Sequence, residues 1–215
     1  SGKSKGMYAT CAVYVAAGNG NTIAVLIDSA KGMNDYKELF KYKERVAVAV
    51  DDGSKEDMVK IFTAIDWVYS EMLARQKSFN EVQAPDFKEW ENLVNLPKDK
   101  IIKYLINPTG PNMTEERAEE WVLENKTSDN VKVAMIVLFF EEFGELLKDP
   151  SFDYYENRSN AGTAAYKLQS FQNVGRSYGI SLSVATQKLS PDYWPKSLDG
   201  GINTKIGFRS ENGHY

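Results

Sequence analysis

The sequence holds a run of eight consecutive apolar residues at positions 133–140, and the acidic residues Glu141 and Glu142 follow it directly. Such a run suits a strand buried on both faces, and it is too short to cross a membrane as a helix. Strands of this kind occur in parallel sheets whose two faces are covered by helices. The run therefore predicts a strand of an α/β fold that ends in two carboxylates.

Other apolar segments alternate with helical patterns along the chain. The predicted strands are residues 22–28, 45–50, 180–185 and 202–208. The predicted helices are residues 4–17, residues 54 to about 79, and residues 162–178, with Gly179 as the stop of the last one. Strands that alternate with helices favour a mainly parallel central sheet flanked by helices.

Residues 81–130 differ from the rest of the chain because they are polar and interrupted by prolines. The prolines are Pro85, Pro97, Pro108 and Pro111. Short helical patterns between them predict a small helical insertion within one domain that covers residues 1–215. A loosely ordered surface excursion is the alternative interpretation of this stretch.

The composition excludes several kinds of site. The only cysteine is Cys11 and the only histidine is His214, so an internal disulfide and a zinc site built from several histidines are ruled out. A single thiol fits a reducing compartment. The net charge of −4 disfavours a surface that binds nucleic acid everywhere, although a few basic residues at one place remain compatible with DNA binding.

Gly2, Lys3 and Ser4 precede a predicted helix and match the end of a Walker A phosphate-binding loop. In that motif the lysine reaches the β- and γ-phosphates, the serine hydroxyl binds Mg²⁺, and the amino end of the helix attracts the anion. A chance tripeptide is the alternative. The first glycine of the full motif would precede Ser1, so we interpret the chain as a fragment of a longer protein.

Three further positions suit an ATPase. P-loop ATPases place an acidic residue at the end of a buried strand to organise Mg²⁺, often followed by a glutamate that orients the attacking water, as Glu141 and Glu142 do here. Gln187 ends a predicted strand and is a candidate γ-phosphate sensor. Arg176 is a candidate arginine finger for a neighbouring subunit. The alternatives are a solvated strand end, a loop entry and a helix-capping arginine.

Together these segments resemble the FtsK/SpoIIIE family, within the HerA–FtsK group of RecA-like motor ATPases, which includes conjugative coupling proteins and type VII secretion ATPases. The matching segments are residues 2–4, 26–28, 71–75, 136–146, 174–188 and 203–208. The resemblance implies a RecA-like P-loop NTPase core with a mainly parallel central sheet flanked by helices. The insertion is similar in position to the all-α insert of coupling proteins.

The resemblance also implies a site for ATP and Mg²⁺. The implied nucleotide-binding residues are Ser1, Gly2, Lys3, Ser4 and Lys5, and the implied Mg²⁺ ligands are Ser4 and Glu141. The family usually has aspartate at the position of Glu141. Because Mg²⁺ demands regular octahedral geometry, we expect the longer glutamate to act through a metal-bound water.

The remaining implied roles concern catalysis and the transported polymer. Glu142 polarises the water, Gln187 senses the γ-phosphate and Arg176 acts in trans, while Lys188 and Lys196 contact DNA phosphates. The expected protein is a homo-hexameric, ATP-driven DNA translocase for chromosome segregation or conjugative (type IV) coupling. We expect it in the cytoplasm, at the inner face of the cell membrane, with a membrane anchor outside this fragment. A type VII-like secretion ATPase acting on a protein substrate is the alternative, and a degenerate scaffold is a third.

Overall fold

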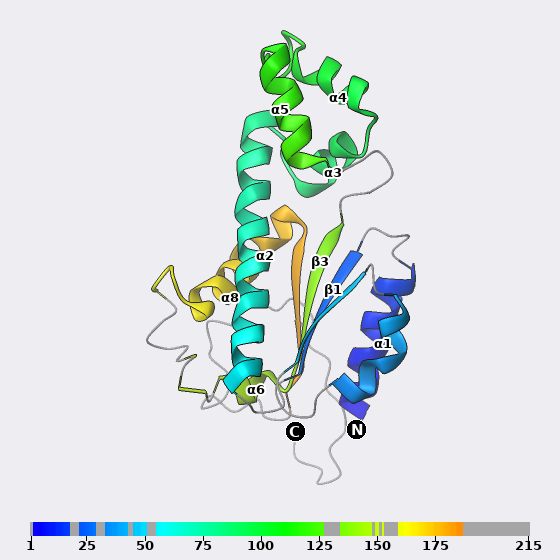
Figure 1. The fold of residues 1–215 in the computed structure, drawn as a ribbon, viewed down its shortest axis with the longest axis vertical. Helices are drawn as coiled ribbons and strands as arrows, with labels where there is room; N and C mark the ends of the chain where they lie inside the picture. The colour runs from blue at the N-terminus through cyan, green and yellow to red at the C-terminus, as the bar shows by residue number, and fades with distance from the viewer. Residues whose placement is uncertain are drawn as a thin grey trace.

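In the described part of the chain, four parallel strands form a sheet in the order β2-β1-β3-β4 (Figure 1). The strands are β1 (Thr22–Asp28), β2 (Val46–Val50), β3 (Met135–Glu141) and β4 (Ile180–Val184). The computed structural model describes residues 2–17, 22–28, 33–42, 45–50, 55–126, 134–147, 149–150, 152 and 159–186. The parallel α/β arrangement predicted from the alternation of strands and helices is confirmed.

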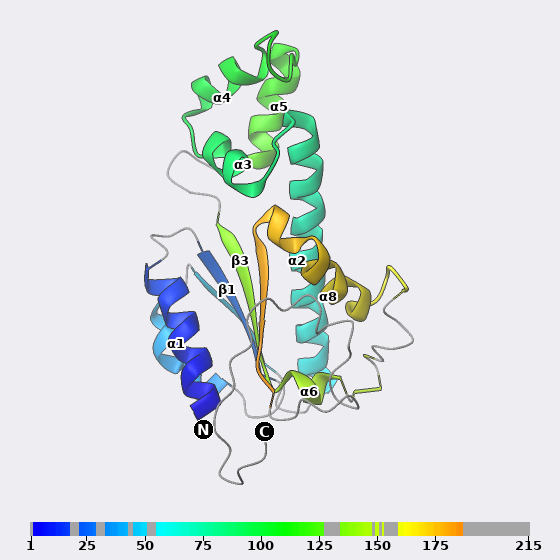
Figure 2. The same cartoon turned by 180° about the vertical axis from the view of Figure 1, so that it is seen from behind.

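Helices cover both faces of this sheet (Figures 1 and 2). One face carries α1 (Gly2–Ala17) and the 3₁₀ helix η1 (Met33–Lys41), and the other carries α2 (Lys55–Val82) and α8 (Ala164–Asn173). The short α6 (Phe143–Leu146) follows β3, and the 3₁₀ helix η2 (Gly175–Tyr178) precedes β4. Among the described residues, no helix combines the length and the apolar character that crossing a membrane requires.

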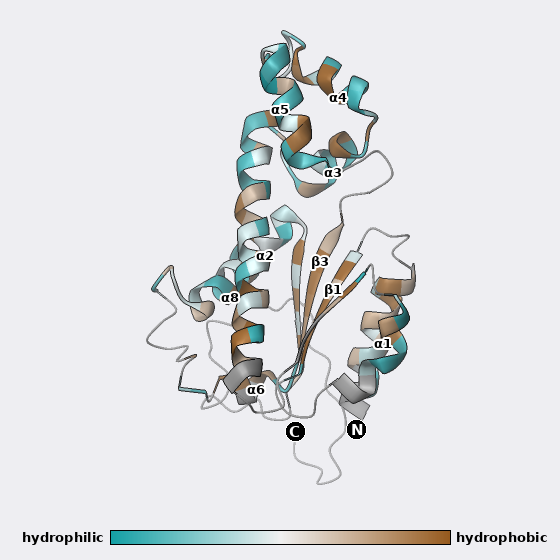
Figure 3. Ribbon diagram, in the orientation of Figure 1, coloured by the Kyte–Doolittle hydropathy of each residue, from teal (hydrophilic) through white to brown (hydrophobic). Residues whose placement is uncertain are grey.

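Alternate side chains of β1 and β3 enter separate cores on the two faces, as the two-residue period of a strand dictates. On the α2 side, Val25, Leu138 and Phe140 pack against Ile61 and Ile65. The core on the α1 side consists of Ala24, Leu26, Val137 and Phe139 with Met7, Cys11, Val15, Tyr36 and Leu39. Figure 3 shows the apolar strands in brown between helices that carry more polar, teal segments.

The predicted boundaries are correct for β1, and within a few residues for most of the others. β3 extends one residue beyond the predicted apolar run and includes Glu141, and α2 ends at Val82 rather than near residue 79. One prediction is wrong. Residues 162–178 form two elements, because the backbone leaves helical geometry at Val174, with φ −131°. The predicted strand at 202–208 lies outside the described residues.

Residues 87–125 form three helices that pack at the far end of α2. They are α3 (Phe87–Val94), α4 (Lys98–Leu105) and α5 (Glu115–Asn125). The side chains of Asp86 and Thr114 accept hydrogen bonds from the backbone of the first turns of α3 and α5 and so cap these helices. Their core is formed by Phe79, Val82, Trp90, Leu93, Val94, Ile101, Leu105, Ala118, Trp121 and Val122. We call this unit the helical insertion.

Arg75 of α2 joins the helical insertion to the sheet. Its buried guanidinium donates hydrogen bonds to the carbonyl oxygens of Ala134 (2.8 Å) and Tyr178 (3.0 Å), and its Nε donates to Glu71 (2.9 Å). The guanidinium also lies over the ring of Phe87 in α3, 5.3 Å from its centroid. Burial lowers the pKa of Arg75 from its ordinary value. One side chain therefore fixes the base of the insertion to the amino ends of β3 and β4.

Gly179 ends η2 in the left-handed conformation, with φ 73°, as predicted for the residue that stops this segment. A Cβ atom at this position would lie 2.4 Å from the ring of Phe87. Gly179 is therefore required both by its backbone conformation and by the close approach of the helical insertion.

Candidate active site

The carboxyl ends of β1 and β3 bring two acidic residues together. Asp28 and Glu141 are direct partners in the register of the two strands, and only 2% of each residue is exposed. Neighbouring strands lie about 4.8 Å apart, and paired residues point to the same face of the sheet. Ala24 and Leu26 face α1, so Asp28 faces α1 as well. The result is a pair of buried carboxylates on the α1 side of the sheet edge.

Glu142 forms the sharp turn between β3 and α6. Its φ of 54° is in the left-handed region, which costs a residue with a side chain about 1–2 kcal/mol, and it is only 6% exposed. Strained backbone of this kind is concentrated at functional sites. The turn places Glu142 next to Glu141 while the chain changes direction.

Backbone hydrogen bonds connect this turn to the end of β4. The amide of Phe143 donates to the carbonyl of Ala185 (3.0 Å), and the amide of Ala185 donates to the carbonyl of Phe140 (2.8 Å). Thr186 follows, and its Oγ1 would lie 2.9 Å from a Cβ atom placed on Gly144. The segment that leads into residue 187 therefore leaves the sheet beside the acidic turn.

Tyr36 contacts Glu141 directly. Its hydroxyl donates a hydrogen bond of 2.6 Å to Oε2 of Glu141, and both residues are buried. Burial, the hydrogen bond to Glu141 and the nearby acidic groups of Glu141 and Asp28 raise the pKa of Tyr36 above its ordinary value. Burial likewise raises the pKa of the Cys11 thiol to about 12. Both groups therefore stay protonated at neutral pH, and Tyr36 remains a permanent donor to Glu141.

The amino end of α1 lies at the same edge of the sheet as the acidic residues (Figures 1 and 2). Met7 accepts a hydrogen bond from Ser183 near the end of β4, whereas the carbonyl of Val15 accepts one from Arg45, which directly precedes β2. The helix therefore runs antiparallel to the strands. Its first turn presents backbone N–H groups and the positive end of the helix dipole, which bind anions.

The structure brings only part of the predicted site together. The backbone of Gly2, Lys3 and Ser4 forms the start of α1, their side chains lie outside the description, and Lys5 is exposed on the same turn. Ser1, Gln187, Lys188 and Lys196 lie outside the described residues.

Arg176 does not join the acidic residues of its own chain. It is exposed in η2, before β4 begins, and so lies at the opposite edge of the sheet from Glu141 and Glu142. The role predicted for Arg176, an arginine finger in the site of a neighbouring subunit, stays a prediction.

The sequence analysis missed two residues of this edge. Asp28 ends an apolar run just as Glu141 does, and this parallel was the available signal. No sequence signal pointed to Tyr36. It belongs to the 3₁₀ helix η1, which was not predicted, and its partner Glu141 is 105 positions away.

Mg²⁺ fits the chemistry of this edge together with a nucleotide. Within the described part of the chain, no group of three or more His, Cys, Asp or Glu residues could hold a metal ion. Mg²⁺ in nucleotide sites is usually bound by one or two carboxylates together with phosphate oxygens and waters. The pair Asp28 and Glu141, opposite the amino end of α1, matches that requirement for a shared site.

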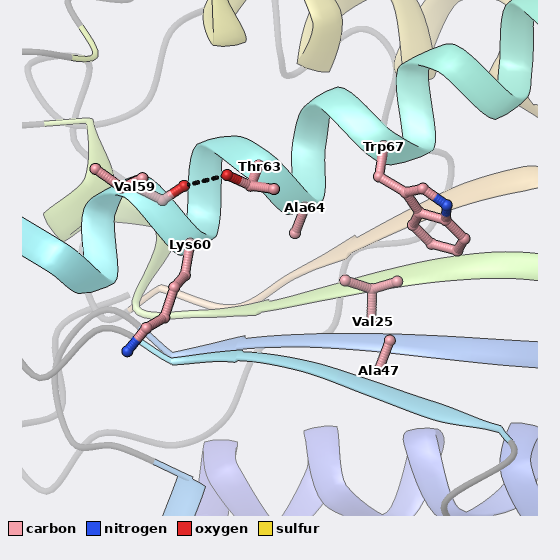
Figure 4. A pocket seen from close by; sticks show the side chains of 7 residues that line it. All are labelled: Val25, Ala47, Val59, Lys60, Thr63, Ala64 and Trp67. Atoms are coloured by element: carbon pink, nitrogen blue, oxygen red, sulfur yellow. Dashed lines mark hydrogen bonds between the residues drawn. The ribbon is translucent and has the colours of Figure 1, made fainter.

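An apolar groove on the other face of the sheet is a separate feature (Figure 4). It has a volume of about 310 Å³ and is lined by Val25 and Ala47 of the sheet and by Val59, Thr63 and Trp67, among others, of α2. The hydroxyl of Thr63 is bonded to the carbonyl of Val59, 2.8 Å away. Because the groove faces α2 whereas Asp28 faces α1, it is not part of the acidic edge.

The sequence matches no protein-family model and no curated protein. Among solved structures, the chain is similar to the conjugation coupling protein TcpA of pCW3, in its monomer form with ATPγS. The TM-score is 0.54 at 15% sequence identity, and the match covers 94% of this chain but 44% of the other, so the chain spans less than half the length of that protein. The likeness concerns the fold: the predicted α/β architecture, with a parallel central sheet flanked by helices, is shared with this coupling protein.

Proposed function

We propose that this chain is the catalytic core of an ATP-driven motor of the FtsK/SpoIIIE type that translocates DNA, in a role such as conjugative coupling. The observation that carries the proposal is the meeting of three features at one sheet edge: the amino end of α1, the buried pair Asp28 and Glu141, and the strained turn at Glu142. The likeness to a coupling protein studied with an ATP analogue supports it.

In this proposal the first turn of α1 binds the nucleotide. The backbone amides and Lys3 bind the phosphates, while Ser4 and Glu141 hold Mg²⁺, with Asp28 beside them. Bound Mg²⁺ supplies positive charge that neutralises the phosphate oxygens during transfer. Burial of Glu141 keeps bulk water from competing for its carboxylate.

Glu142 orients the attacking water in line with the γ-phosphate, accepting its hydrogen bond. The left-handed turn and the bond from the amide of Phe143 to the carbonyl of Ala185 fix the backbone from which the Glu142 side chain extends. Gln187, a short distance along the chain from Ala185, senses the γ-phosphate, and Arg176 acts on the nucleotide of the next subunit in a hexamer.

The transported polymer is DNA in this proposal. Lys188 and Lys196 contact its phosphates in the pore of the ring without reading the bases. Segments outside this chain hold the motor at the inner face of the cell membrane.

An ATPase assay of the intact protein, with and without DNA and at increasing salt, tests the proposal. We expect stimulation by DNA that disappears steeply as salt rises, because binding through phosphates releases counterions. Glu142→Gln should still bind ATP but lower turnover about 100-fold or more, as expected for the loss of a catalytic base.

Glu119→Gln is the matched control, since it makes the same change on an exposed position of α5. Turnover of Glu142→Gln at the parent rate would refute the assignment of the base. ATPase activity that ignores DNA but responds to a protein substrate would instead identify a secretion ATPase of the type VII kind.

A further inference from the structure

Glu141 has one more methylene than the aspartate that usually holds Mg²⁺ at this position in the resembled family. A longer side chain has an additional torsion, so its carboxylate is harder to hold in one orientation. Mg²⁺ accepts little deviation from octahedral geometry. A glutamate at this place therefore needs a second group that fixes it.

Tyr36 has the geometry to be that group. The distance of 2.6 Å between its hydroxyl and Oε2 of Glu141 is that of a short, charge-assisted hydrogen bond. The residue is only 2% exposed, and its ring packs against that of Tyr8 in α1, with the centroids 6.3 Å apart. The packed ring holds the hydroxyl in place, so the donor is rigid and the carboxylate must adapt to it.

The length of Glu141 matches the position of Tyr36. Shortening the side chain by one methylene would withdraw the carboxylate by about 1.5 Å, the length of one carbon–carbon bond. The contact of 2.6 Å would then open to about 4 Å, beyond the range of a hydrogen bond. An aspartate at this position could not keep the bond to Tyr36 without movement of η1.

We propose that Tyr36 is a positioning residue that orients the Glu141 carboxylate for Mg²⁺, and that the two residues act as one unit matched in length. This inference rests on the proposed function, because it assigns Tyr36 a part in the same nucleotide site. Tyr36 acts only through Glu141, and it touches neither the nucleotide nor the attacking water.

The test is a Mg²⁺ titration of ATPase activity, paired with the affinity for a fluorescent ATP analogue with and without Mg²⁺. The variants are Tyr36→Phe, Glu141→Asp and the double variant, all in the intact protein. Tyr36→Phe should raise the Mg²⁺ concentration for half-maximal activity about tenfold or more, as is typical for loss of a group that orients a metal ligand. Analogue binding without Mg²⁺ should stay at the parent value.

Glu141→Asp should raise the Mg²⁺ requirement too, although it restores the residue that is usual in the resembled family. In the double variant the requirement should be no higher than in the worse single variant, because both changes remove the same contact. The matched control is Tyr14→Phe. Tyr14 lies in the same core and packs on Phe139 of β3, so its substitution also removes one hydroxyl.

Two outcomes with an active parent protein overturn the inference: a parent-like Mg²⁺ requirement in Tyr36→Phe, or effects that multiply in the double variant. If Tyr36→Phe fails to fold, Glu141→Asp decides alone, and an unchanged or lower Mg²⁺ requirement refutes the matched pair. A parent protein without Mg²⁺-dependent hydrolysis removes the proposed function and this inference with it, so the two failures are distinguishable.

Discussion

The helical insertion and the acidic edge of the sheet both bury polar groups, but they use them differently. In the insertion, the Nζ of Lys126 donates to the carbonyls of Val94 (3.0 Å) and Leu96 (2.8 Å), which closes the ends of helices onto one another. At the sheet edge, the carboxylates of Asp28, Glu141 and Glu142 are all buried. Asp28 pairs with Glu141 in the strand register, and Glu142 follows Glu141 with a strained backbone. The first arrangement holds helices together, and the second gathers like charges.

This difference distinguishes buried polar groups that stabilise the fold from buried polar groups that cost stability. Burying carboxylates side by side costs stability, so a fold keeps them only where they serve another purpose. Left-handed backbone alone does not separate the regions, because Gln83 and Asn112 also have positive φ, 57° and 54°. Buried donors that reach carbonyl oxygens need no such explanation, because these buried oxygens cannot bond to water and would otherwise lack a hydrogen-bond partner. The comparison therefore predicts that substitutions in the core of the insertion mainly lower stability, whereas substitutions at the acidic edge mainly lower activity.

The largest effect should come from the core of the insertion. Trp121 is fully buried, so Trp121→Ala should lower the free energy of unfolding by about 3–5 kcal/mol, measured by urea denaturation. Amide exchange should accelerate in α3, α4 and α5 more than in β3. Leu123→Ala, on the same helix but 72% exposed, should change stability by less than about 0.5 kcal/mol. Equal loss of protection in β3 would show that the two regions unfold as one unit.

A smaller effect should come from the link between the insertion and the amino ends of the strands. Arg75→Met removes the donor to the carbonyls of Ala134 and Tyr178, and buried acceptors without partners should cost about 2 kcal/mol. Arg117→Met provides the comparison, because Arg117 is part of a partly exposed network with Glu81 and Glu124 that should contribute less than about 1 kcal/mol. If thermal or urea denaturation gave equal losses, the surface network would contribute as much to stability as the buried arginine does.

The smallest effect concerns the strained turn of the acidic edge. Glycine adopts the left-handed region freely, so Glu142→Gly should be more stable than Glu142→Ala by about 1 kcal/mol, although both should lose hydrolysis. Denaturation midpoints of the two variants measure this difference directly. An alanine variant as stable as the glycine variant would mean that the turn stores no strain.

The sequence was sufficient where a local pattern determines the structure. The apolar run that ends in Glu141 and Glu142 predicted β3 and the carboxylates at its end, and the short helical patterns between the prolines predicted helices in the insertion. Gly179 was found from its position after a helical segment, and the structure gives it the expected left-handed backbone.

Tertiary contacts decided what the sequence could not predict. The strand order, and with it the pairing of Asp28 with Glu141, depends on residues more than one hundred positions apart. The partner of Tyr36 is also remote, 105 positions away, and the carbonyl partners of Arg75 are 59 and 103 positions away. The break at Val174 was also missed, because Gly175 packs closely against Ile180 and turns the chain into β4.

The length of α2 gives the molecule a mechanical property. The helix has 28 residues, which corresponds to about 42 Å, and it runs from the core beside Phe143 and Leu146 to the helical insertion. A tilt of about 5° at the end near α6 would displace the other end by about 4 Å over that length. Under the proposed function, a small rearrangement at the α6 end would therefore become a larger displacement of the helical insertion.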